Sequence, residues 1–170
     1  MNFNLIKSKL EELKLPAWRL KQLRQAYFKD LLDGWDSVTT LSKDMKAELV
    51  GFDWDGVKPK VILNSKSGTA HKALFELKDG KFVEAVLMVY EGRITVCISS
   101  QVGCNMGCTF CATGRGGFGR NLEPYEIVDQ VVWWSRFVRQ KLKSKGFDRV
   151  TNVVYMGMGE PFNNWPNVWE

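Results

Sequence analysis

Residues 93–122 read RITVCISSQVGCNMGCTFCATGRGGFGRNL, and this stretch decides the fold that we expect for the chain. An apolar strand at 93–100 runs directly into a glycine-rich loop at 101–120. A helical pattern then begins at Pro124, and a second apolar strand follows at 150–156. The order strand, loop, helix, strand is typical of a βα barrel or an open α/β sheet.

Three of the four cysteines are crowded into this glycine-rich loop. Cys104, Cys108 and Cys111 have C-x3-C-x2-C spacing. A structural zinc site commonly takes four ligands, and His71, the only histidine, lies far upstream. A cubane iron–sulfur cluster also takes four thiolates, so this loop would leave one iron open to a small molecule. The spacing alone is compatible with a disulfide, a zinc site or an iron–sulfur cluster, although a zinc site fits it less well.

The composition is that of a folded protein with a basic surplus. The 170 residues are 45% hydrophobic and 25% charged, which excludes disorder as the main state. Lys and Arg number 24 against 19 Asp and Glu, and the formal charge of +5 suits a polyanionic partner. No stretch approaches the roughly 20 apolar residues of a membrane span. The N-terminus also lacks a secretory signal, so we expect a cytoplasmic location, no membrane partner and reduced thiols.

Periodicity divides the chain into three segments. Helical spacing over 4–13, 16–28 and 43–50 predicts a small helical accessory domain at residues 1–52. A linker is expected over 53–59. Antiparallel strands are expected at 69–77, 82–90 and 93–100, joined by short turns, so residues 53–92 hold the linker and most of these strands. Residues 93–170 are expected to begin the core α/β domain.

The loop from Cys104 to Cys111 resembles the C-x3-C-x-aromatic-C loop of radical S-adenosylmethionine (SAM) enzymes. Further blocks, in order along the chain, resemble the RlmN type of adenine-C2 RNA methyltransferase: 97–104, 111–114, 117–118, 120–122 and 156–161, with the likeness starting at 15–19. The resemblance implies a helical domain, an antiparallel segment and the start of a partial radical-SAM barrel. It also implies a [4Fe-4S] cluster held by the three loop cysteines, with SAM on the open iron.

The same resemblance assigns the second loop, 157–163, to SAM. Gly159 and Glu160 match a Gly-Glu-Pro motif that contacts the methionine amino group, and Phe110 matches an aromatic residue near the adenine. An ordinary Gly-Pro turn and simple loop packing are the alternatives. Because active sites of such folds lie beyond the C-terminal ends of the strands, we expect loops 101–120 and 157–163 to converge on one site.

Two candidate catalytic residues lie in the antiparallel region. Glu84 interrupts an apolar stripe of its strand, and burial there would raise its pKa toward the range that suits proton transfer. An edge-strand glutamate that reaches solvent is the alternative. The place of Glu84 matches the proton-accepting glutamate of the family. Cys97 is by pattern a small buried residue. By resemblance it is the thiol that resolves a protein–substrate intermediate through a transient disulfide.

The resemblance implies that one SAM methylates a cysteine near the C-terminus and that a second SAM supplies a radical. The substrates would be an adenine of 23S ribosomal RNA and one of transfer RNA, and flavodoxin or ferredoxin would donate electrons. No cysteine follows Cys111, so we expect an N-terminal part of a longer protein that is inactive alone. A C8-specific relative and a truncated cluster-binding protein are the alternatives.

These expectations make predictions about two surfaces of the chain. The helix that carries Trp18, Arg19, Lys21 and Arg24 is expected to contact RNA, or else to be a solvated charged face. In a shortened barrel we also expect apolar surface to be exposed at the last strand and at the long helix. The residues concerned are Val153, Val154, Trp133 or Trp134.

Overall fold

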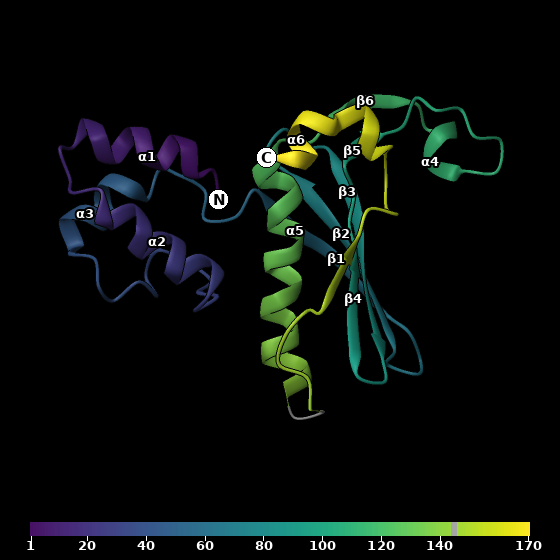
Figure 1. The fold of residues 1–170 in the computed structure, drawn as a ribbon, viewed down its shortest axis with the longest axis horizontal. Coiled ribbons are helices and arrows are strands. Elements are labelled where there is room, and N and C mark those ends of the chain that lie inside the picture. The colour runs from purple at the N-terminus through teal and green to yellow at the C-terminus, as the bar shows by residue number, and fades with distance from the viewer. Residues whose placement is uncertain (144–145) are drawn as a thin grey trace. The chain divides into compact units, whose positions relative to one another are not determined.

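The computed structural model describes residues 1–143 and 146–170. The chain divides into two compact units, Met1–Gly56 and Val57–Glu170. The first unit is helical, and the second combines a sheet with helices (Figure 1).

The helical unit contains three short helices: α1 (Phe3–Glu12), α2 (Trp18–Phe28) and α3 (Lys43–Leu49). Asn2 and Ser42 cap α1 and α3, since their side chains accept hydrogen bonds from backbone N–H groups of the first turn. The core is strongly aromatic: Tyr27 is fully buried and packs edge-on against Trp54, whose ring centroid is 5.7 Å away. Such aromatic burial stabilises a unit that is too small to form a large aliphatic core.

The second unit is built on a five-stranded sheet in the order β1-β2-β3-β4-β7. The strands are β1 (Val57–Asn64), β2 (Ala70–Leu77), β3 (Phe82–Tyr90), β4 (Arg93–Cys97) and β7 (Asn152–Val154). The first four pair antiparallel, whereas β4 and β7 are parallel and place Cys97 opposite Val154. The C-terminal ends of β4 and β7 therefore lie side by side.

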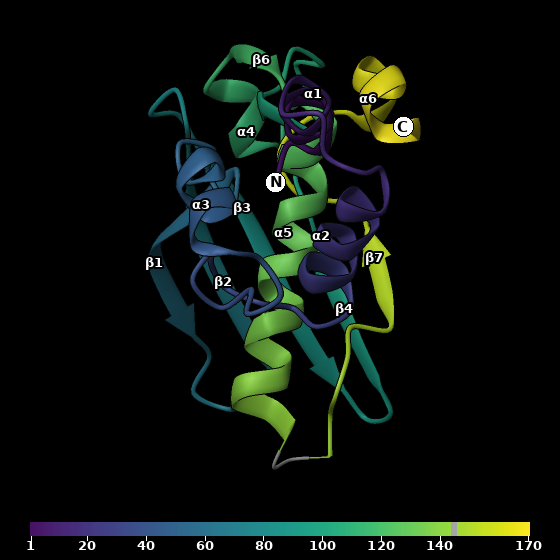
Figure 2. The same cartoon turned by 90° about the vertical axis from the view of Figure 1, so that its left-hand side faces the viewer.

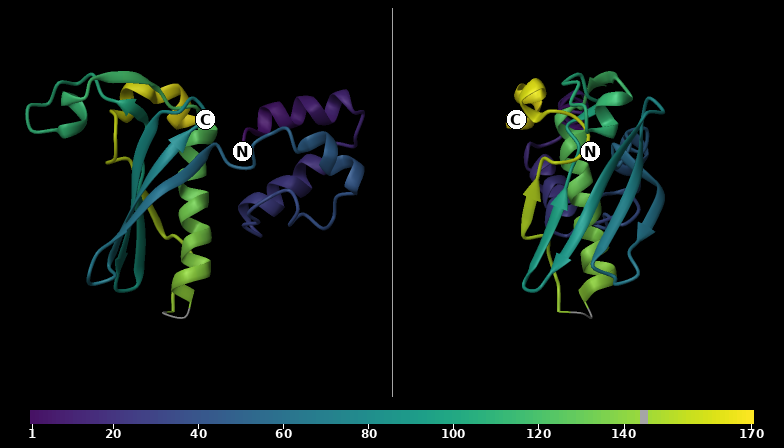
Figure 3. Two further views of the ribbon diagram at one scale, coloured as in Figure 1. Left: turned by 180° about the vertical axis from the view of Figure 1, so that it is seen from behind. Right: turned by 90° about the vertical axis from the view of Figure 1, so that its right-hand side faces the viewer.

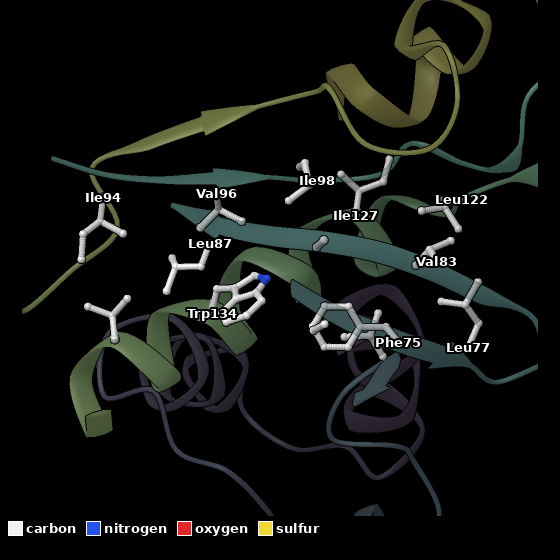
Figure 4. Packing of buried hydrophobic residues seen from close by; sticks show 14 of the residues in the cluster. Phe75, Leu77, Val83, Leu87, Ile94, Val96, Ile98, Leu122, Ile127 and Trp134 are labelled. Atoms are coloured by element: carbon white, nitrogen blue, oxygen red, sulfur yellow. The ribbon is translucent and has the colours of Figure 1, made fainter. Parts of the chain in front are cut away.

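Helix α5 (Pro124–Phe137) lies along one face of the sheet and encloses the core (Figures 2 and 3). Alternate residues of β2, β3 and β4 face it, among them Phe75, Leu87 and Val96, all fully buried. Trp134 of α5 projects into the middle of this cluster (Figure 4). The opposite face of the sheet carries the partly exposed residues of the same strands.

Short elements gather at the end of the sheet where β4 and β7 finish (Figure 1). A two-stranded hairpin there pairs β5 with β6. The elements are β5 (Gln101–Gly103), α4 (Ala112–Arg115), β6 (Phe118–Asn121), a 3-10 turn at Pro161–Asn164 and α6 (Trp165–Trp169).

Several boundaries differ from those expected from the sequence. Strand β1 starts at Val57, inside the expected linker. It is an edge strand, where a proline such as Pro59 is tolerated because no second neighbouring strand needs its missing N–H group. The pairing register of β1 with β2 is irregular next to Pro59. The expected boundary at residue 93 falls between β3 and β4, which pair in one sheet. Helix α5 continues as a π-helical turn, Val138–Leu142. The sequence predicts a helix over 124–145, and its last two residues lie outside the described residues.

The structure confirms the expected exposure of apolar residues only in part. Val153 is 44% exposed on the edge strand β7, whereas Trp134 is fully buried, so the expectation for this tryptophan was wrong. The reason is that the sheet formed by β1 to β4 is wide enough to cover the helix by itself. Among the described residues, none of the helices is long and apolar enough to cross a membrane.

Candidate functional site

The two loops singled out in the sequence meet beyond the C-terminal ends of β4 and β7, as expected. The segment after β4 and the segment after β7 are joined by backbone hydrogen bonds, because the Ser100 amide donates to the Met158 carbonyl at 2.9 Å. The Asn163 side chain donates to Asn105 Oδ1 at 3.0 Å, which ties the Gly-Glu-Pro segment directly to the cysteine loop. The topology thus brings residues nearly 60 positions apart into one site.

The cysteine loop is closed at its base by the β5–β6 hairpin. The Cys104 amide donates to the Gly117 carbonyl at 2.9 Å. Gly103 has a φ of +73°, and a Cβ there would overlap the Gly117 carbonyl oxygen. Glycine is therefore required at residue 103 both for backbone conformation and for close approach.

The three loop cysteines differ in exposure. Cys104 is buried at the base of the loop, Cys111 is half-buried and Cys108 is exposed. Cys111 immediately precedes α4, where backbone N–H groups, first that of Gly114, hydrogen bond to the sulfur and hold the pKa of the thiol below its usual value. All four cysteines are free. Within residues 1–143 and 146–170, no group of three or more Cys, His, Asp or Glu is gathered in metal-binding geometry.

The donor set nevertheless fits an iron–sulfur cluster better than zinc. Three free thiols in a single loop are the ligands that iron–sulfur clusters prefer. His71, the histidine that a zinc site would recruit, is buried on β2 and its Nδ1 lies 2.6 Å from Asn64 Oδ1. The loop supplies three sulfur ligands and His71 is already engaged elsewhere.

The Gly-Glu-Pro segment packs tightly on the chain that follows β4. A Cβ at Gly157 would lie 2.7 Å from the Ile98 carbonyl oxygen, and a Cβ at Gly159 would lie 2.5 Å from Gln101 Cβ. Gly159 also has a φ of +96°. The carboxylate of Glu160 accepts a hydrogen bond from the Phe162 amide at 3.1 Å, which orients it at the start of the 3-10 turn. These glycines let two loops approach more closely than other residues would allow.

Glu84 and Cys97 lie on the same face of neighbouring strands, the face opposite α5. Cys97 pairs with Val86, two residues beyond Glu84 on β3, so the two candidate side chains are diagonal neighbours. The side chain of Glu84 is 44% exposed, and its carboxylate forms an ion pair with Lys72 at 2.9 Å. Glu84 is thus only partly buried, and it lies on a strand inside the sheet and not at its edge. Partial burial raises the pKa of the Cys97 thiol.

Phe110 is 87% exposed at the tip of the loop. The loop-packing alternative for this residue is therefore not what the structure shows. An exposed ring is available to contact a planar ligand, and the sequence resemblance places this aromatic residue near the adenine of SAM.

Sequence reasoning missed several buried polar residues that hold the site together. Gln130 of α5 accepts from the Ser99 amide and donates to the Ser99 carbonyl, at 2.9 and 3.0 Å. Gln101 accepts from the Glu160 amide at 2.9 Å and donates to Asn121 at 2.8 Å. The polar run at 99–101, directly after an apolar strand, was the signal available in the sequence.

Comparison with solved structures finds a radical SAM methyltransferase from Sphaerobacter thermophilus. Its fold superposes with a TM-score of 0.90 at 36% sequence identity, over 99% of this chain and 48% of that protein. Among curated proteins, a relative named probable dual-specificity RNA methyltransferase RlmN, from a Nocardioides species, is 46% identical over 159 residues. This chain is homologous to RlmN. No family model matches it.

The RlmN likeness extends across most of the chain. The match to the Nocardioides protein covers 93% of this chain and 42% of the relative. The RlmN of Campylobacter curvus is 41% identical over 175 residues, which cover 95% of this chain and 46% of that protein. The chain thus spans less than half the length of the RlmN relatives, and within that span it has the mixed α/β fold of a radical SAM methyltransferase.

Proposed function

We propose that this chain forms part of a radical SAM methyltransferase that methylates C2 of an adenine in 23S ribosomal RNA and in transfer RNA. The observation that carries the proposal is the meeting of the cysteine loop and the Gly-Glu-Pro segment, linked by the Asn163–Asn105 hydrogen bond. The dual-specificity RNA methyltransferase names of the relatives support the choice of RNA as substrate.

The cofactors would be held by residues of both loops. Cys104, Cys108 and Cys111 would bind a [4Fe-4S] cluster, while Gly159 and Glu160 would bind the methionine part of SAM. When bound, this pair of cofactors would supply one-electron chemistry, which methylation of the non-nucleophilic adenine C2 requires. Glu160 suits an ammonium group, because carboxylate and carbonyl oxygens at a strand end are hydrogen-bond acceptors. Phe110 would stack on the adenine of SAM.

Glu84 and Cys97 would act on the open face of the sheet. Glu84, whose carboxylate forms an ion pair with Lys72, would accept the proton that leaves the methylated carbon. Cys97 would form a transient disulfide with the methyl-carrying cysteine as the product is released. No cysteine follows Cys111 in this sequence, so that partner would come from outside the 170 residues.

Anaerobic reconstitution with iron and sulfide tests the proposed cofactors. We expect iron and sulfide to bind in the ratio of a [4Fe-4S] cluster, with the reduced form giving an electron paramagnetic resonance signal that SAM perturbs. Reduction by flavodoxin or ferredoxin would show the expected electron donor. A cluster whose signal is indifferent to SAM would favour a protein that only binds a cluster, and tight zinc binding without a redox signal would contradict the proposal.

A further inference from the structure

The helical unit contains a pocket that the proposed cofactor chemistry does not use. Its volume is ≈ 570 Å³, which lies within the range of ordinary ligand pockets. One wall is a single face of α2, where Trp18, Lys21, Gln22 and Gln25 recur at helical spacing. The other wall is the chain from residue 30 to residue 40.

The lining suits a planar, hydrogen-bonding ring. The buried residues Ala26 and Val38 contribute apolar surface, and Trp18, which is 54% exposed, offers a large aromatic face. Amide and hydroxyl groups surround this surface, from Gln25, Thr39 and other residues of the lining. Apolar surface beside an aromatic ring, with a few polar groups placed around it, is the arrangement that binds nucleobases by stacking and edge contacts.

The surroundings of the pocket favour an anionic ligand. Residues 15–29 contain Arg19, Lys21, Arg24 and Lys29 and no acidic residue. The Arg19 guanidinium is already positioned, since it lies 4.0 Å from the Trp18 ring centroid and donates to Gln22 Oε1 at 2.9 Å. Asp30 also lines the pocket, and a carboxylate there can accept from an N–H of a base edge.

We propose that this pocket receives one unpaired nucleobase of the RNA substrate. The base stacks on the face of the Trp18 ring that Arg19 does not cover, its edge contacts the amide and hydroxyl groups of the lining, and Lys21 contacts a flanking phosphate. This inference rests on the proposed RNA substrate, and it adds that the helical unit recognises a base outside a duplex, in addition to backbone charge. RNA is commonly recognised through such unpaired bases, because the bases of an A-form duplex are poorly accessible.

The test uses the full 170-residue chain and two RNA hairpins of equal length. One hairpin carries a single-nucleotide bulge of 2-aminopurine, and the other is fully paired. We expect the bulged hairpin to bind about tenfold tighter, as base–aromatic stacking typically provides, with quenching of the 2-aminopurine fluorescence. Trp18→Ala should abolish that preference and the quenching, and Trp18→Phe should retain most of both.

Two further variants separate stacking from charge. Lys21→Ala should weaken binding of the bulged hairpin and lower the slope of its salt dependence, whereas Trp18→Ala should leave the slope unchanged. Trp169→Ala removes a tryptophan that is 76% exposed in the other unit. It should change neither the affinity for the bulged hairpin nor the slope of its salt dependence. Circular dichroism confirms that each variant is folded.

The outcomes distinguish this inference from the proposed function. The base pocket would be overturned, with RNA binding left intact, if the wild type bound both hairpins with equal affinity. The same holds if Trp18→Ala weakened the binding of both hairpins by the same factor. Failure to bind either hairpin would overturn the RNA substrate and the base pocket together. Quenching that survives Trp18→Ala would place the unpaired base elsewhere on the chain and also overturn the pocket.

Discussion

Replacement by alanine should affect iron binding differently at the three loop cysteines and at Cys97. Replacement of Cys104, Cys108 or Cys111 by Ala should abolish iron binding, because a cluster held by three thiolates has none to spare. Cys97→Ala should leave the iron content unchanged, since Cys97 lies on the sheet face and not in the loop. Iron and sulfide assays after anaerobic reconstitution measure both. Equal loss of iron in the Cys97 variant would make it a fourth ligand and favour an electron carrier.

Gly159 has a structural consequence that its sequence motif does not reveal. Gly159→Ala combines an unfavourable φ with contact against Gln101 and should lower the unfolding free energy by about 1–3 kcal/mol. Gly80→Ala is a matched control: it shares the positive φ but has nothing within 4 Å of its Cβ, so it should cost less. Urea unfolding followed by tryptophan fluorescence compares the two. Equal losses would mean that close approach to Gln101 contributes nothing.

At the scale of elements, Arg120 of β6 connects three parts of the second unit. Its guanidinium donates to Asp79 in the β2–β3 turn at 2.7 Å, and to both carboxylate oxygens of Glu126 in α5 at 2.7 and 2.9 Å. Glu126 is buried, and its carboxylate also accepts from the Glu123 amide. The hairpin that closes the cysteine loop is therefore anchored to both the sheet and the helix.

Arg120→Ala leaves Glu126 buried without its cation and should cost about 3 kcal/mol of unfolding free energy. The control Lys60→Ala breaks the more exposed Lys60–Glu76 ion pair and should cost less than about 1 kcal/mol. Thermal or urea unfolding at neutral pH measures both. A loss no larger than that of the control would show that the Arg120 contacts do not anchor the hairpin.

The same contacts predict a dependence on pH. The hydrogen bond from Arg120 holds the pKa of Asp79 below its ordinary value of 3.8. This carboxylate therefore contributes stability above pH 3.8, and the contribution is lost as the pH falls through the lower pKa of the folded state. Unfolding measured between pH 5 and about 2 should show a steeper loss for the wild type than for Arg120→Ala. Parallel curves would contradict this coupling.

The elements that could be predicted from the sequence are those with a strong local pattern. Alternation identified β2 and β3, and helical spacing with a first-turn proline identified α5. The elements β5 and β6 were missed, because strands of three and four residues that contain glycine carry no periodic signal. The roles of Gln101 and Gln130 were not predictable either, since a buried amide is explained only by partners distant in sequence.

At the scale of the whole molecule, the sheet ends in the edge strand β7, where Val153 is 44% exposed. An unprotected edge with an apolar side chain promotes pairing between copies. We expect the 170-residue chain to associate as its concentration rises, and Val153→Lys to reduce that association. Analytical ultracentrifugation measures both chains, and an unchanged sedimentation coefficient across concentrations in the wild type would contradict the expectation.

Residues 104–117 form a loop whose two ends meet at the base of the β5–β6 hairpin, beside Gly103 and Gly117. This loop can therefore be exchanged as a unit. Because its two ends already meet, doubling the length of the loop adds only about 0.6 kcal/mol of closure cost. Insertions at the exposed tip would thus leave the sheet undisturbed, while a side chain at Gly103 would force the ends apart. The same property allows the loop to be transplanted: grafted onto another hairpin with a glycine pair at its base, it would carry its three thiols to a new scaffold.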